Sequence, residues 1–131
     1  MTQALVESFG SADWWRTVFR AIGEMRGVGW VILFQDPATH RLTNHWITLH
    51  QDGVPAGFKT LLVMDVWKHA YMGNYKATDS DQYVAASFRN IAWSGVEARL
   101  REERAVRPAA SASVTVSPRR HRDGRGNPPD R

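Results

Sequence analysis

Cysteine is absent from this sequence of 131 residues. Its absence excludes disulfides, thiolate nucleophiles, zinc fingers and iron–sulfur clusters. Any metal ion must therefore be held by imidazole and carboxylate groups, which suit iron, manganese or zinc. Long hydrophobic runs are also absent, since no apolar stretch approaches the roughly 20 residues that span a bilayer. The start MTQALVESFG lacks the basic and apolar regions of a signal peptide, so we expect a cytoplasmic protein without membrane contact.

An excess of charge of one sign is missing from most of the chain. Residues 1–100 contain nine basic and nine acidic residues, whereas residues 101–131 contain eight basic and four acidic ones, which accounts for the net charge of +4. A nucleic-acid-binding domain is therefore not expected. From Pro108 the sequence PAASASVTVSPRRHRDGRGNPPDR has too little apolar content to offset the entropy of ordering. We expect a folded domain over residues 1–106 and a disordered basic tail over 107–131, which at most touches RNA or acidic lipid weakly.

Hydrophobic periodicity predicts the elements of the folded part. Residues 9–25 are predicted to form a helix with Ser11 as its N-cap. Its apolar residues recur at helical spacing: Trp14, Trp15, Val18, Phe19 and Ile22. Strand-like runs follow at residues 30–35, 43–50 and 61–67, and helical segments at 67–75, 81–92 and 93–104. The short early connections favour an α+β fold in which a small three-stranded antiparallel sheet packs with helices.

The candidate chemistry lies in the stretch MDVWKHAYM, in which Asp65 and His69 are four residues apart. If a helix begins near Asp65, both side chains project from one face of it. They could then bind a single metal ion, as two of the three groups of a facial His/carboxylate triad do. The alternative is that the aspartate is a helix cap and the histidine is a hydrogen-bonded surface or core residue, which is the commoner role of an isolated pair.

Four stretches of this sequence resemble the iron/manganese superoxide dismutase family. MDVWKHAYM resembles the family signature Asp-Val-Trp-Glu-His-Ala-Tyr-Tyr, and ESFGSADWW resembles the Phe-Gly-Ser helix start that opens the family's C-terminal domain. GVGWVIL resembles its Gly-Ser-Gly-Trp strand, and TLLVMDVW its Pro-Leu-Leu-x-x-Asp-Val-Trp strand. The resemblance covers residues 5–100, in consistent order.

The resemblance implies an iron or manganese ion that disproportionates superoxide to O₂ and H₂O₂. It implies that Asp65 and His69 are metal ligands and that Trp30 and Trp67 wall the metal pocket against bulk water. It also implies that Gln51 is hydrogen-bonded to the metal-bound solvent, with the adjacent His50 as the alternative in this register.

The sequence departs from the family pattern in two respects. In the family, two further histidine ligands come from an N-terminal helical hairpin, and this chain has no second pair of ligands at helical spacing. Lys68 and Met72 stand where the family has a glutamate and a tyrosine of a cross-subunit network. Because lysine only donates hydrogen bonds and methionine has no hydroxyl, these two residues cannot support the family's symmetric dimer contact in the same way.

Three hypotheses about function follow. The first is a superoxide dismutase that depends on a separately supplied N-terminal half. Without that half, the helix with Trp14, Trp15 and Phe19 is expected to expose an aromatic face that could contact the missing half or a second copy. The second is a non-catalytic interaction module with the same fold. The third is a truncated or frameshifted product, because a tail rich in arginine and proline is typical of a shifted frame in GC-rich DNA. Retention of both ligands and both pocket tryptophans favours the first.

Overall fold

The computed structural model describes residues 1–49, 52–76 and 78–105. Its described part is an α+β fold in which a three-stranded antiparallel sheet packs with helices, as predicted, although it has five helices where the sequence predicted four. The elements are α1 (Thr2–Phe9), α2 (Ala12–Gly23), β1 (Trp30–Gln35), β2 (Leu42–Ile47), β3 (Lys59–Asp65), α3 (Lys68–Tyr71), α4 (Ser80–Arg89) and α5 (Trp93–Ala105). The predicted domain boundary at residue 106 and the predicted basic tail lie outside these ranges and stay predictions.

The N-terminal segment forms two helices where the sequence predicted one. Gly10 separates α1 from α2 with a φ of 85°, a conformation that glycine adopts at little cost. The prediction of Ser11 as an N-cap is confirmed, because its Oγ accepts a hydrogen bond of 3.0 Å from the amide of Trp14. The periodicity missed α1 because this short helix buries only Leu5.

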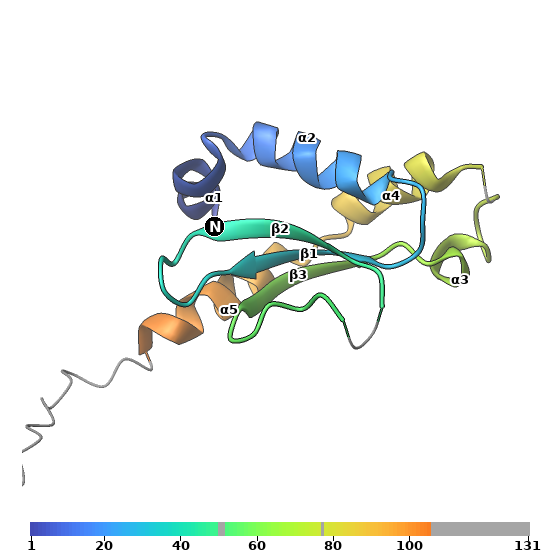
Figure 1. The fold of residues 1–131 in the computed structure, drawn as a ribbon. Helices are drawn as coiled ribbons and strands as arrows, with labels where there is room; N and C mark the ends of the chain where they lie inside the picture. The colour runs from blue at the N-terminus through green and yellow to red at the C-terminus, as the bar shows by residue number, and fades with distance from the viewer. Residues whose placement is uncertain (50–51, 77, 106–131) are drawn as a thin grey trace, which may run out of the picture.

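The sheet has the strand order β2-β1-β3, with β1 in the centre (Figure 1). Trp30, the first residue of β1, lies opposite Ile47 of β2 and Asp65 of β3. The third strand ends at Asp65, two residues before its predicted end, and the amide of Val66 donates a 2.9 Å hydrogen bond to the carbonyl oxygen of Gly29. The start of β1 and the end of β3 therefore meet at one end of the sheet.

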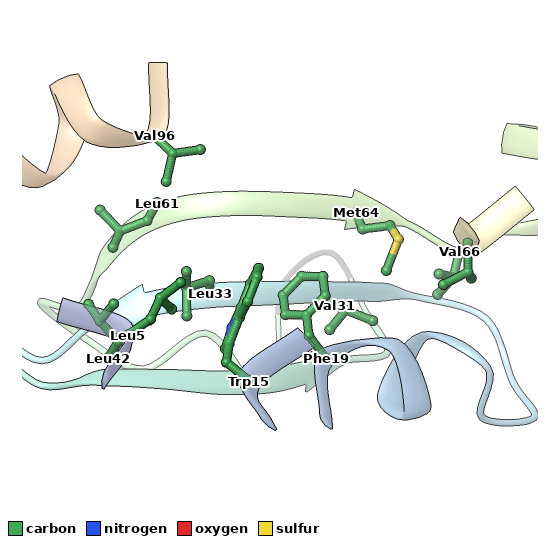
Figure 2. Close-up of a cluster of buried hydrophobic side chains, with 11 residues drawn as sticks. Leu5, Trp15, Phe19, Val31, Leu33, Leu42, Leu61, Met64, Val66 and Val96 are labelled. Carbon is green, nitrogen blue, oxygen red and sulfur yellow. The ribbon is translucent and has the colours of Figure 1, made fainter. Parts of the chain in front are cut away.

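One face of the sheet forms the main core with α1, α2, α4 and α5 (Figures 1 and 2). Its buried members are Leu5, Trp15, Phe19, Val31, Leu33, Leu42, Leu61, Met64, Val66, Val84 and Val96. A smaller cluster of Ile32, Phe34 and Ile47 lies on the opposite face, where Trp30 and Phe58 partly cover it. Since alternate residues of β1 enter the two clusters, both faces of the sheet are covered near the central strand.

The sequence predicted an exposed aromatic face on the first predicted helix. This prediction is wrong for two of the three residues named for that face. Trp15 and Phe19 are each only 1% exposed, whereas Trp14 is 58% exposed. The ring of Trp15 contacts Phe88 and Trp93 of the C-terminal segments at centroid distances of 6.0 and 5.7 Å. The chain's own sheet and C-terminal helices thus cover this face, and only Trp14 remains for a partner.

Among the described residues, no helix combines the length and the apolar character needed to cross a membrane.

Candidate metal centre

The candidate ligands lie at the junction between β3 and α3, at the end of the sheet farthest from α1 (Figure 1). Asp65 is the last residue of the strand, and Trp67 is still extended, with φ −65° and ψ 144°, as the N-cap of α3. The helix starts within one residue of its predicted start at residue 67, so Asp65 lies in the strand and not on the helix. The apolar β3 pairing with β1 continues through Asp65, so the helix starts only at Lys68.

Asp65 and His69 nevertheless come together across this junction. The Oδ2 atom of Asp65 lies 3.6 Å from the Nε2 atom of His69. The other carboxylate oxygen, Oδ1, accepts a 2.8 Å hydrogen bond from the amide of Trp67. This bond restrains the carboxylate so that Oδ2 faces the imidazole.

The pair fits the ligand set of a redox metal. Metal bonds to imidazole nitrogen and carboxylate oxygen are about 2.0–2.2 Å long, so a single ion can contact two atoms separated by 3.6 Å. The side chains of His69 and Asp65 are 70% and 38% exposed, which leaves both ligand atoms accessible. Among the described residues, however, no group of three or more His, Cys, Asp or Glu side chains is placed to hold a metal ion.

Two tryptophans flank the pair, namely those to which the resemblance assigns the wall of the metal pocket. The ring of Trp67 stacks on the imidazole of His69 at a centroid distance of 5.8 Å and an angle of 24°. The ring of Trp30 lies 5.5 Å from that of Trp67, and Trp30 is the β1 partner of Asp65 in the sheet register. The structure thus brings four of the five predicted site residues together. The fifth, Gln51, lies outside the described residues, as does its alternative His50.

The sequence did not indicate that Tyr83 of α4 also belongs to this site. Its hydroxyl donates a 2.8 Å hydrogen bond to the main-chain carbonyl oxygen of Asp65. All three tyrosines of the chain gather here, since the ring of Tyr83 lies 5.2 Å from that of Tyr71 and 6.1 Å from that of Tyr75. A tyrosine 18 positions after the aspartate carries no local signal of such a contact.

The two residues that depart from the family signature lie on the outer surface of the junction. Lys68 is exposed, and Met72 is 56% exposed. Neither side chain belongs to the buried core, so both are available to a partner or to solvent.

Comparison with known protein families identifies the family of this chain. The model of the family "Iron/manganese superoxide dismutases, C-terminal domain" matches residues 1–99. The chain belongs to the iron/manganese superoxide dismutase family. The match is to the C-terminal domain of that family, which confirms the resemblance predicted from the sequence.

Named superoxide dismutases from bacteria and archaea are similar to this chain. A superoxide dismutase (Mn) of Mycobacterium intracellulare is 34% identical over 100 residues, which are 76% of this chain and 48% of that protein. A superoxide dismutase (Mn/Fe) of Aeropyrum pernix is 35% identical over 97 residues, or 73% and 45% of the two chains. A third, superoxide dismutase (Mn) 2 of Haloferax volcanii, is 32% identical over 102 residues, or 78% and 50%. The chain spans about half the length of these superoxide dismutases.

Proposed function

We propose that this chain contributes Asp65 and His69 to the iron or manganese centre of a superoxide dismutase, with the other ligands coming from an N-terminal half. The observation that carries this proposal is the 3.6 Å approach of Oδ2 and Nε2 beside two tryptophan rings. The family match over residues 1–99 supports it. The bound metal would supply the one-electron redox chemistry that converts superoxide to O₂ and H₂O₂.

The residues around the pair have distinct roles in this proposal. The amide of Trp67 orients the carboxylate of Asp65, and the Trp67 ring restrains the plane of the His69 imidazole. The ring of Trp30 lies beside that of Trp67, so the two rings cover one side of the pair, and the properties of a metal site depend on such an apolar surround. Lys68 adds an exposed positive charge next to His69, which attracts an anionic substrate and is screened by salt.

A second candidate function is a non-catalytic interaction module with the same fold. The observation in its favour is that Lys68 and Met72 are exposed where the family signature has a glutamate and a tyrosine. In that case the junction would contact a partner without holding a metal ion.

Metal analysis separates the two functions. The purified full chain is loaded with Mn²⁺ or Fe²⁺ in the presence of the N-terminal half of a similar superoxide dismutase, and metal content and dismutase activity are measured. We expect about one ion per assembled site and measurable activity. The variant His69→Ala should lower metal affinity by more than about 100-fold, because it removes a ligand and not merely a residue that supports one.

A histidine outside the site supplies the control. His40 lies in the exposed β1–β2 turn with a φ of 58°, which asparagine also adopts, so His40→Asn should keep the wild-type metal content. Equal metal content in wild type and His69→Ala would contradict the proposed dismutase function and favour the interaction module. An assembled complex of the two halves without dismutase activity would do the same.

A further inference from the structure

Tyr83 contacts both parts of the chain that carry the ligand pair. Its hydroxyl donates to the carbonyl oxygen of Asp65 at the end of β3. Its ring stacks on Tyr71 at 5.2 Å and an angle of 28°, and Tyr71 is the last residue of α3, the helix that carries His69. One side chain of α4 is thus in contact with the strand of one ligand and the helix of the other.

The helix that carries His69 needs such support. With the four residues Lys68–Tyr71 it has a single turn, and its N-cap Trp67 makes no side-chain capping bond. Helices this short are not stable by themselves, because nucleation costs more than one turn of hydrogen bonds returns. Tyr71 is 8% exposed and supplies the buried contact of this turn. The position of His69 relative to Asp65 therefore depends on the packing of Tyr71 against its neighbours.

We propose that Tyr83 is a positioning residue for the Asp65–His69 pair. It holds the backbone of Asp65 through its hydroxyl and the α3 turn through its ring, and so maintains the spacing of the two ligand atoms. Its relevance to metal binding rests on the proposed function, whereas its effect on the backbone of the junction does not.

Hydrogen exchange tests the positioning role without any metal. The variant Tyr83→Phe removes the hydroxyl and keeps the ring. The reporter is the amide of Trp67, which donates to Oδ1 of Asp65. In NMR measurements on the full chain we expect this amide to exchange roughly 2- to 10-fold faster in Tyr83→Phe, the change that corresponds to one lost hydrogen bond. The amide of Leu33 in the central strand should exchange at the wild-type rate.

Tyr75→Phe is the matched control, because it removes a hydroxyl from the same ring cluster and leaves the bond to Asp65 intact. It should leave Trp67 exchange unchanged. The positioning role is overturned if Tyr83→Phe does not change Trp67 exchange, if Tyr75→Phe changes it equally, or if Leu33 exchange rises by the same factor, which would indicate general destabilisation.

A Mn²⁺ titration extends the test to the ligands. Paramagnetic broadening of the amide signals of residues 65–69 gives an apparent dissociation constant for Mn²⁺. We expect this constant to rise about 10-fold in Tyr83→Phe, the usual scale for residues that orient ligands, and to stay unchanged in Tyr75→Phe. Equal dissociation constants for wild type and Tyr83→Phe would overturn only the proposed effect of Tyr83 on metal binding. Broadening that His69→Ala does not reduce would instead contradict the proposed function, and the exchange data would still decide the positioning role.

Discussion

Gly29 is the single residue on which the approach of β1 to the candidate site depends most directly. It precedes Trp30 with a φ of 148°, and a Cβ atom there would collide with the carbonyl oxygen of Ile47. Its own carbonyl oxygen accepts the hydrogen bond of Val66, next to Asp65. A side chain at this position would therefore push the start of β1 away from the end of β2, directly beside the pairing of Trp30 with Asp65.

We predict that Gly29→Ala lowers the free energy of unfolding by more than about 2 kcal/mol, since it adds a backbone collision to conformational strain. Gly10→Ala is the control, because Gly10 has a φ of 85° but a Cβ atom added there would meet no atom within 4 Å. Strain alone should cost about 1 kcal/mol there. Urea denaturation measures both losses, and equal losses would contradict the collision.

At the scale of elements, the β1–β2 hairpin is closed by the carboxylate of Asp36. Its oxygens accept hydrogen bonds from the hydroxyl of Thr39 at 2.7 Å and from the amide of Ala38 at 2.8 Å. These bonds, that of Thr39 above all, lower the pKa of Asp36 from its ordinary value. The carboxylate of Asp36 thus binds a proton more readily in the unfolded chain than in the folded hairpin. Its contribution to the stability of the fold is therefore fully present above the ordinary pKa of about 4. It is lost as the pH falls through the lowered pKa.

We predict that Asp36→Asn weakens the dependence of stability on pH below about 4, because an amide does not titrate. The measurement is the urea midpoint between pH 2 and pH 6. If Asp36→Asn keeps the wild-type slope, the carboxylate does not stabilise the turn.

At the scale of the whole molecule, Trp15 joins the helices to the sheet. Its ring lies within 5.2 Å of Phe19, and its indole nitrogen donates a 3.1 Å hydrogen bond to Oδ1 of Asn44 in β2. The Trp15 ring also contacts Phe88 of α4 and Trp93 of α5, so it joins the two C-terminal helices to the same core. Figure 2 shows the Trp15 and Phe19 rings against the sheet, so this residue lies where the separate elements meet.

We predict that Trp15→Ala destabilises the chain by about 3–5 kcal/mol, the usual cost of removing a large buried ring. Trp14→Ala should change stability by less than about 0.5 kcal/mol, because that ring is mainly exposed. Chemical denaturation of the two variants gives the comparison. A larger loss for Trp14 than for Trp15 would contradict the packing described for α2.

The outcomes at each scale show which features local sequence could predict. The strand at residues 30–35 was predicted with its observed bounds, because a run of β-branched and aromatic residues has a strong local preference. The N-cap of α2 was predicted for a similar reason. The change from strand to helix near residue 67 was predicted as well, since β3 ends at Asp65 and α3 begins at Lys68. The single helix face considered for Asp65 and His69 does not form, because pairing with β1 keeps Asp65 in the strand. The burial of Trp15 was missed because its partners lie up to 78 positions away, at Trp93.

The sequence by itself determined the absence of thiol chemistry, the α+β class, the family and the identity of the two candidate ligands, since all of these depend on residue types and their local order. Only the tertiary structure decided how closely Oδ2 of Asp65 and Nε2 of His69 approach, because this distance depends on the conformation of the strand–helix junction. It also decided that Trp30 lies beside Asp65 and that Tyr83 holds its backbone. These contacts join residues that are 35 and 18 positions apart. They arise from strand pairing and the shared core, which no local pattern encodes.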